Sequence, residues 1–202
     1  MGLTLNTNSL TLGSGGAASG VSTSDVTTLI KNNTPYKFIA KVDASDSSTV
    51  DCSNVFTASD GFSSYRIILD NLTTASSSSY LWMRLTVSGS VYTTAHYGWS
   101  VVRHEGTGSL ASNYENWDSK WRLHNSDSNT GYTGICDLGN TAVGLRTQSR
   151  YHVASGSSTQ RGNFAAGGGG SAITGEVDGF HIISSSPNFT SGTVRIYGVN
   201  NV

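Results

Sequence analysis

The feature that most constrains this chain is an alternation of apolar and polar side chains, with a period of two, within residues 63–104. In the first run Tyr65, Ile67 and Leu69 share one face. After a Ser/Thr-rich break, residues 80–87 repeat the pattern, with an apolar set formed by Leu81, Met83, Leu85 and Val87. Such runs, rich in branched and aromatic residues and bounded by turn formers, predict half-buried antiparallel strands.

Three pairs of alternating runs lie close enough along the chain to predict hairpins. They are 36–42 with 49–53, the two runs within 63–87, and 177–184 with 193–199. One antiparallel sheet cannot bury its apolar face alone, so the hairpins should face other strands across a shared core. The sequence therefore predicts an all-β fold, an antiparallel jelly-roll-like β-sandwich formed by residues 35–202.

Weaker patterns fill the space between these pairs. Residues 97–103 and 119–124 are expected to form strands. Residues 105–113 read as a loop, and the glycine run 167–170 reads as a flexible loop before the last pair. On this interpretation, residues 105–118 and 155–171 would form the distal loops of the sandwich.

The composition is consistent with one such domain and argues against nucleic acid and membrane as partners. The 202 residues include 24 glycines, which suits many short strands with many turns. Only 12% of residues are charged and the formal net charge is -1, so no basic tract indicates a nucleic-acid partner. No run approaches the ~18 apolar residues of a membrane span, so membrane insertion is not expected. The N-terminus lacks the basic and apolar regions of a signal peptide.

Residues 1–34 differ from the rest and are predicted to form an N-terminal arm with one short helix. A Leu-Thr-Leu motif occurs twice before a Gly/Ser tether, and residues 22–33 carry a helix-start pattern with three apolar residues on one face. Two short strand-like pieces and a short helix cannot fold alone, so the arm should mediate attachment or oligomerisation. The expected assembly contacts are Leu3, Leu5, Leu10, Leu12, Val26, Leu29 and Ile30.

The two cysteines indicate no redox or metal chemistry. Cys52 and Cys136 lie far apart in the sequence and match no zinc spacing. The pattern favours two reduced, buried thiols over a disulfide bridge, because no feature places the two residues within bridging distance.

Catalytic motifs are weak throughout the chain, and neither a cofactor nor a metal is expected. No Gly-x-Ser-x-Gly elbow occurs. Glu115 with Asp118 is the best carboxylate pair for a glycosidase, and Glu176 is a further candidate. Residues 125–131 resemble a calcium loop, but the glycine comes one place late and no glutamate stands at the twelfth position, so a tight hairpin turn is the favoured interpretation. The sequence therefore predicts a protein that is not an enzyme.

An aromatic cluster offers a binding function instead. Tyr114, Trp117 and Trp121 lie beside amide and carboxylate side chains, and flat aromatic faces of this kind could stack on sugar rings. The alternative is that they fill the core. Trp121 alternates with Leu123 and is expected inside, whereas for Trp117 the two interpretations are evenly matched. Tyr114 and Trp117 are therefore the candidate glycan contacts.

Several segments together resemble a β-sandwich group found in virion proteins of tailed phages, particularly marine and cyanobacterial ones. The matching pieces are Tyr-Arg-Ile-Ile-Leu-Asp-Asn-Leu from residue 65, Tyr-Leu-Trp-Met-Arg-Leu-Thr-Val-Ser from residue 80, the Tyr-Gly-Trp strand from residue 97, and the segment 179–199, which contains Ser-Gly-Thr-Val-Arg-Ile-Tyr-Gly-Val. The resemblance covers residues 36–199 and is one of strand and turn pattern, without a catalytic motif. Ile196 and Thr86 stand where Leu and Ser are commoner in the group.

The resemblance implies a non-enzymatic structural component of the virion, of the tail-fibre, head-fibre or decoration type, often trimeric. It implies contact with other capsid or tail proteins, assembly in the host cytoplasm and exposure on the particle surface, with the arm as the anchor. Two roles compete within it: a decoration protein, and a receptor-binding module that contacts host surface glycan. A small polysaccharide-degrading enzyme is the outside alternative, and it would require Glu115 or Glu176.

Overall fold

The computed structural model describes residues 3–6, 9–12, 16–17, 35–57, 61–62, 64–75, 79–104, 110–126, 131–139, 141, 146–156, 163–185 and 188–199. The chain divides into two compact units: Met1–Lys37 with Asn200–Val202, and Phe38–Val199.

The smaller unit contains a three-stranded antiparallel sheet. Its strands are β1 (Leu3–Asn6), β2 (Ser9–Leu12) and β3 (Gly16–Ala17). The two Leu-Thr-Leu motifs pair with each other, with Leu3 opposite Leu12 and Leu5 opposite Leu10. The predicted helix at 22–33, with Val26, Leu29 and Ile30, lies outside the described residues.

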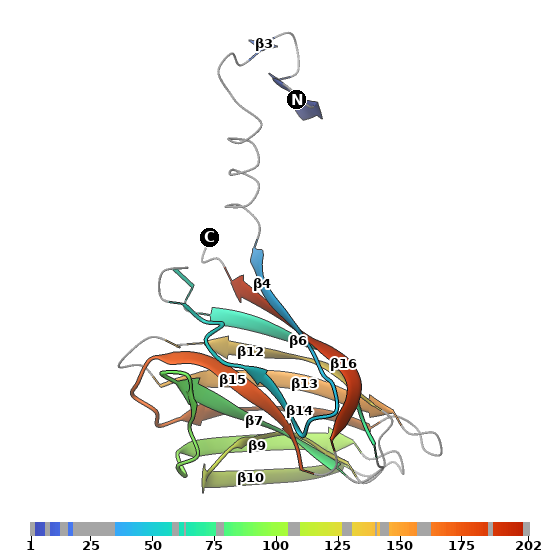
Figure 1. Cartoon of the computed structure of the whole chain (residues 1–202), viewed down its shortest axis with the longest axis vertical. Helices are drawn as coiled ribbons and strands as arrows, with labels where there is room; N and C mark the ends of the chain where they lie inside the picture. Colours follow the sequence, from blue (N-terminus) through green and yellow to red (C-terminus); the bar gives the residue numbers. More distant parts are fainter. Residues whose placement is uncertain are drawn as a thin grey trace. The chain divides into compact units, whose positions relative to one another are not determined.

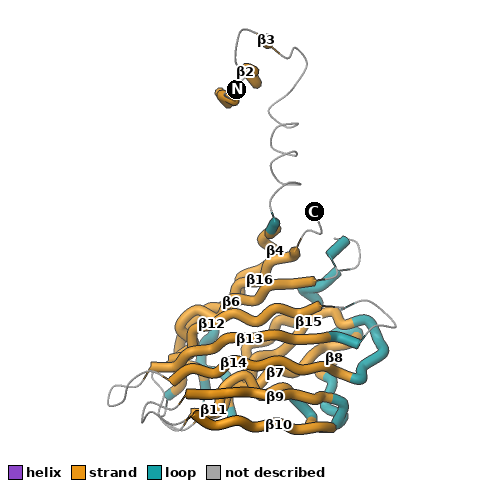
Figure 2. The backbone as a smooth tube through the Cα atoms, turned by 180° about the vertical axis from the view of Figure 1, so that it is seen from behind, coloured by secondary structure: helices purple, strands orange, loops and turns teal. Residues whose placement is uncertain are grey.

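The larger unit is built from two antiparallel sheets (Figures 1 and 2). In pairing order, the eight-stranded sheet contains β10 (Leu110–Asp118), β9 (Tyr97–His104), β14 (Asn163–Ser171), β13 (Gln148–Gly156), β12 (Gly131–Gly139), β6 (Ser64–Thr74), β16 (Phe189–Val199) and β4 (Tyr36–Asp43). The five-stranded sheet contains β11 (Trp121–Ser126), β7 (Ser79–Val87), β15 (Val177–Ser184) and β5 (Thr49–Cys52), with β8 (Ser90–Val91) paired to β7. The predicted all-β antiparallel sandwich is confirmed.

The apolar residues of the alternating runs form the core between the two sheets. Along β6 the side chains of Tyr65, Ile67 and Leu69 are buried, and along β7 those of Leu81 and Met83 are buried from the opposite sheet. Each fully buried side chain of this size contributes about 1.5–3 kcal/mol through its removal from water. A one-residue slip in either strand would turn this whole set toward solvent, so the core fixes the register.

The three predicted hairpins are wrong, and all for the same reason. β4 and β5, β6 and β7, and β15 and β16 are consecutive along the chain, but the members of each pair belong to different sheets. A period of two identifies the buried face of a strand and carries no information on its hydrogen-bonding neighbour. The short connections therefore cross between the layers, and consecutive strands line opposite walls of the core.

The hairpin expected at 125–131 fails in the same way. β11 pairs with β7 of the five-stranded sheet, whereas β12 pairs with β13 and β6 of the eight-stranded sheet. The strands on either side of residues 127–130 therefore belong to different sheets.

Both predicted loops contain strands. In the first predicted loop, 105–113, the residues from Leu110 onward belong to strand β10. The glycine run 167–170 lies inside strand β14, which pairs with β9 and β13. A Cβ atom at Gly167 would come 2.7 Å from the Tyr151 hydroxyl oxygen, and one at Gly169 would come 2.9 Å from the Trp121 ring nitrogen. The carbonyl oxygens of Ser100 and Gly98 on the neighbouring strand β9 lie closer still, so these two positions have no room for a Cβ atom, and the run does not signal flexibility.

The expectations for Trp121 and the cysteines are confirmed. Trp121 is fully buried, and its indole N–H donates to the carbonyl oxygens of Gly98 (3.2 Å) and Gly170 (3.3 Å). Cys52 on β5 and Cys136 on β12 are free and buried. Burial raises the pKa of the Cys52 thiol to about 12 and raises that of Cys136 as well, so both are unreactive at neutral pH.

Candidate functional site

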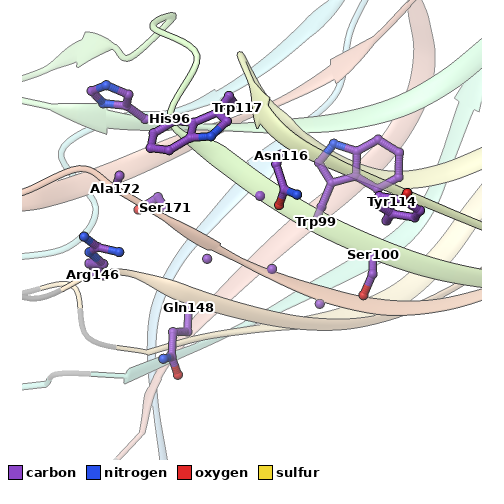
Figure 3. Close-up of a pocket in the computed structure, with 14 residues that line it drawn as sticks. His96, Trp99, Ser100, Tyr114, Asn116, Trp117, Arg146, Gln148, Ser171 and Ala172 are labelled. Carbon is purple, nitrogen blue, oxygen red and sulfur yellow. The ribbon is translucent and has the colours of Figure 1, made fainter.

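A groove of about 580 Å³ crosses the solvent-facing side of the eight-stranded sheet, at the end where β10 forms its edge (Figure 3). This volume is typical of ligand sites in proteins. Described residues of β10, β9, β14 and β13 and their flanking segments line it: His96, Gly98, Trp99, Ser100, Tyr114, Asn116, Trp117, Arg146, Gln148, Gly168, Gly169, Gly170, Ser171 and Ala172. The candidate contacts Tyr114 and Trp117 are both among them.

A β-bulge brings these two aromatic residues to the same side. Three positions apart on a regular strand, Tyr114 and Trp117 would point to opposite faces. In the β10–β9 ladder, however, Glu115 pairs with Trp99 and Asp118 pairs with Tyr97, so β10 has one extra residue. The extra residue reverses the alternation, and both aromatic side chains line the groove.

Both aromatic rings are largely open to solvent. Tyr114 is 78% exposed and Trp117 is 68% exposed, so the interpretation of Trp117 as a core plug is wrong. Trp117 also has a φ of 66°, a left-handed conformation that costs a bulky residue of order 1–3 kcal/mol. The fold thus holds a large apolar side chain in water and in a strained backbone, a combination found mainly at binding sites.

A short chain of contacts supports the Trp117 ring from the preceding segment. The ring of His96 lies edge-on to that of Trp117, with 6.1 Å between their centroids. The hydroxyl oxygen of Tyr92 lies 2.8 Å from Nδ1 of His96. These contacts restrict the motion of the indole, and they therefore reduce the conformational entropy that the side chain would lose when a ligand binds.

The floor of the groove has few side chains, and not all of its glycines are required by packing. At Gly98 a Cβ atom would come no closer than 3.5 Å to another atom, and at Gly170 no closer than 4.0 Å. The structure therefore tolerates a side chain at both positions, unlike Gly167 and Gly169. Glycine at such positions leaves space for a ligand to approach the backbone.

The opposite rim is polar. It is formed by two exposed residues: Arg146, which lies just before β13, and Gln148, which is the first residue of β13. Figure 3 shows both across the groove from Asn116 and Trp117. β10 and β13 are three strand spacings apart, about 14 Å. The groove is therefore broad, with aromatic groups on one rim and a guanidinium and an amide on the other.

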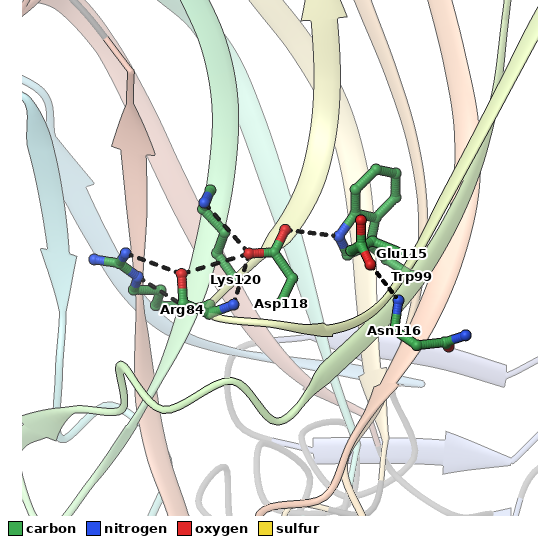
Figure 4. A network of polar contacts seen from close by, with 7 residues as sticks. Arg84, Trp99, Glu115, Asn116, Asp118 and Lys120 are labelled. Atoms are coloured by element: carbon green, nitrogen blue, oxygen red, sulfur yellow. Dashed lines mark hydrogen bonds and ion pairs between the residues drawn. The ribbon is translucent and has the colours of Figure 1, made fainter.

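A polar network ties the end of β10 to the second sheet (Figure 4). The Trp99 indole N–H donates to a carboxylate oxygen of Asp118 at 3.1 Å, and Lys120 Nζ donates to the other oxygen at 3.4 Å. Arg84 of β7 donates from Nε to the Ser119 carbonyl oxygen at 3.1 Å. The bulged rim is thereby held in place before any ligand arrives.

The three candidate catalytic carboxylates differ in their surroundings. Burial tends to raise the pKa of Asp118, but hydrogen bonds from Trp99, Ser119 and Lys120 outweigh it and hold the pKa below its ordinary value. A general acid needs a raised pKa, so Asp118 is poorly suited to donate a proton. Glu115 is exposed and accepts a hydrogen bond from the Asn116 N–H at 3.1 Å. Glu176 precedes β15 of the other sheet.

A Ser, His and Asp do meet elsewhere, on the five-stranded sheet. The Ser53 hydroxyl donates to Asp51 at 2.6 Å, and His181 Nε2 lies 3.1 Å from the Ser53 hydroxyl oxygen and 3.0 Å from an Asp51 oxygen. In a catalytic triad the acid and the nucleophile contact different ring nitrogens. Here both contact Nε2, so the cluster resembles a structural hydrogen-bond network.

Among the described residues, no group of three or more His, Cys, Asp or Glu side chains is placed to hold a metal ion. Most of the calcium-like loop, residues 127–130, is not described. The described part of the chain contains no helix long and apolar enough to span a membrane.

Sequence reasoning identified the aromatic rim but missed the rest of the groove. Nothing singled out Arg146 or Gln148, because neither belongs to a recognisable motif. The composition of the glycine run 167–170 predicts a loop, whereas the run lies inside β14. Of the predicted assembly contacts, Leu3, Leu5, Leu10 and Leu12 lie on β1 and β2, and their contacts with other chains stay a prediction.

Comparisons with known proteins add little. No model of a known protein family matches the chain, and no curated protein matches it by sequence. A solved structure described as the CBM2 module of the evolved Dit of Lactobacillus casei BL23 phage J-1 matches 69% of this chain, with 8% identity and a TM-score of 0.21. The chain spans 64% of that structure, and this TM-score is too low to establish a shared fold.

Proposed function

We propose that this protein binds glycan through the groove between β10 and β13. The observation that carries the proposal is the bulge that places Tyr114 and Trp117, both largely exposed, on the same side of an edge strand. Exposed aromatic groups that converge on a groove are a recognised sign of a binding site.

The chemistry of the lining fits a sugar polymer. The flat faces of Tyr114 and Trp117 offer apolar surfaces for the C–H faces of sugar rings. The side-chain amides of Asn116 and Gln148 each supply donors and an acceptor for ring hydroxyl groups. The open floor at Gly98 and Gly170 admits the ligand close to the backbone.

We further propose that the chain is a non-enzymatic structural component of a tailed-phage virion, exposed on the particle surface and anchored by its N-terminal arm. The support is the resemblance of residues 36–199 to virion β-sandwich proteins. A homo-oligomer, with a trimer favoured, and contact with capsid or tail proteins follow from the same resemblance. The groove favours a receptor-binding role over a purely decorating one.

The test is a two-target binding assay with labelled full-length protein, using candidate host cells and particles stripped of this protein. Saturable binding to cells is expected, with at least tenfold weaker binding for Tyr114→Ala and for Trp117→Ala, an effect of the size typical for aromatic anchors. The matched control is Phe164→Ala. It removes an aromatic side chain that is 46% exposed on β14 of the same sheet but does not line the groove.

Two outcomes would contradict the proposal. Unchanged cell binding in both groove variants would exclude the groove as the receptor site. Binding to stripped particles alone, lost on removal of residues 1–33, would instead assign the chain to the decoration class.

A further inference from the structure

We infer that the groove selects glycans that carry carboxylate groups, and that Arg146 is the residue that recognises the carboxylate. The inference rests on the proposed glycan-binding role and adds a substrate class to it. Its occupant is an acidic oligosaccharide, of the kind built from uronic acid units.

The charge of the lining is one-sided. Among the fourteen described residues that line the groove, none is Asp or Glu, whereas Arg146 carries a permanent positive charge. The nearby carboxylate Asp118 is already occupied by Trp99 and Lys120. An anionic group entering the groove would therefore meet a cation, with no described carboxylate in the lining to repel it.

Arg146 also differs from the other outward-facing arginines of this sheet. Arg66 forms a bidentate contact with Asp137 (2.7 and 2.9 Å), and Arg150 donates to the same carboxylate at 3.2 Å. Arg195 pairs with Asp70 at 2.5 Å. Within the described part of the chain, Arg146 has no such carboxylate partner, and it is the arginine that lines the groove.

The geometry of the two rims explains why the ligand should be an acidic sugar and not a free anion. A guanidinium presents a planar fork of N–H donors that matches a carboxylate in bidentate fashion. Tyr114 and Trp117 occupy the other rim, about 14 Å away across three strand spacings. One sugar ring does not span that distance, so engaging both rims requires an oligosaccharide whose acidic unit lies at Arg146.

The experiment measures binding of the full-length chain to polygalacturonate, alginate and hyaluronan, and to the carboxyl-reduced form of each polymer. Reduction converts each uronic acid to a neutral sugar without changing the backbone of the polymer. Dextran sulfate serves as a non-carboxylate polyanion. The variants are Arg146→Gln and the control Arg195→Gln, which removes the same charge from an outward position on β16 that does not line the groove.

At least one uronic polymer should bind about tenfold more tightly than its reduced form, a difference typical of a charge-assisted hydrogen bond. Arg146→Gln should remove that preference, Arg195→Gln should retain it, and added salt should weaken it. Thermal unfolding of Arg146→Gln should match that of the parent chain, and Arg195→Gln should unfold at most slightly below it, because it loses a half-exposed ion pair with Asp70.

The other outcomes separate the carboxylate selectivity from the proposed function. Equal binding of parent and reduced polymers, a preference that survives Arg146→Gln, or binding to dextran sulfate alone would overturn the carboxylate selectivity and leave the proposed function standing. Failure of all these polymers, with host-cell binding still lost in Tyr114→Ala and Trp117→Ala, would do the same. Absence of binding to the cells and to every polymer would remove the proposed function and this inference together.

Discussion

The indole N–H of Trp99 on β9 donates a 3.1 Å hydrogen bond to Asp118, the residue at which the bulged strand β10 ends. This bond joins a buried residue of the sheet to the strand that carries the exposed aromatic rim. Because Arg84 of β7 donates to the carbonyl oxygen of Ser119, the next residue, the end of β10 is held from both sheets.

Removal of the Asp118 carboxylate should therefore loosen the rim. Asp118→Ala leaves the Trp99 N–H and the Lys120 ammonium without an acceptor, and should lower the free energy of unfolding in urea by about 2 kcal/mol. Glu115→Ala is the control, because this carboxylate of the same strand is exposed, and it should cost less than about 0.5 kcal/mol. Equal losses in the two variants would show that the Asp118 network does not stabilise the rim.

Acid should weaken the sandwich partly through Asp137. Hydrogen bonds from Arg66, and to a lesser extent Arg150, outweigh burial and hold its pKa below the ordinary 3.8. A lowered folded-state pKa gives stability that is complete above the unfolded-state pKa, and that is lost as the pH falls through the folded-state value. Asp137→Asn should thus cost about 1 kcal/mol at pH 7 and progressively less as the pH falls below 3.8.

Urea unfolding of the parent chain and Asp137→Asn across this pH range measures the difference directly. Glu176→Gln, which removes the same charge, should change stability by less than about 0.5 kcal/mol at pH 7. A cost for Asp137→Asn that showed no decline as the pH falls below 3.8 would mean that its effect does not arise from ionisation.

The sequence predicts which face of each strand is buried, but it does not predict which strands pair with one another. The alternation in residues 65–69 and 81–85 identified the buried side chains, because burial acts on each strand separately; beyond it the prediction is wrong, since Thr86 is buried and Val87 only partly so. Pairing depends on where the chain goes after each strand, and a short connection can either return beside a strand or cross to the other sheet. The crossing of β6 to β7 therefore could not be predicted from the pattern.

The site was only half predictable for a related reason. Aromatic groups beside amides suggested that Tyr114 and Trp117 contact sugars, but their spacing of three predicts opposite faces on a regular strand. The bulge that unites them is a property of register with β9, and no residue in the segment signals it. Arg146 joins the site only because β13 lies beside β14.

Two substitutions at Trp117 should differ in stability but not in binding, because the backbone there is strained. Its φ of 66° is easily adopted by glycine and costly for residues with a Cβ atom. Trp117→Gly should therefore be about 1 kcal/mol more stable than Trp117→Ala in urea unfolding, while both lose glycan binding. Equal stabilities would indicate that the conformation is not strained.

The N-terminal arm should determine the oligomeric state. If the strands containing Leu5 and Leu10 connect subunits, a chain that starts at Pro35 should be a monomer in light scattering, and the full chain should not. Leu5→Asp combined with Leu10→Asp tests the same point without truncation, because like charges at paired positions destabilise a sheet. The same subunit count in all three proteins would defeat the prediction.

The glycines of β14 should divide into those required by the core and those that keep the groove open. At Gly169 a Cβ atom would lie 2.9 Å from the Trp121 ring nitrogen and close to the Gly98 carbonyl oxygen, so Gly169→Ala should destabilise the fold by about 1–3 kcal/mol. At Gly170 a Cβ atom meets nothing closer than 4.0 Å. Gly170→Val should therefore keep the parent stability within about 1 kcal/mol, since branched residues suit strands.

The same Gly170→Val variant should nevertheless reduce glycan binding at least tenfold, because its methyl groups would stand on the floor between the two rims. Calorimetric unfolding and host-cell binding of Gly169→Ala and Gly170→Val, measured together, provide the check. A Gly170→Val protein that folds and binds as the parent does would mean that no ligand approaches the backbone there. The open floor would then have no part in recognition.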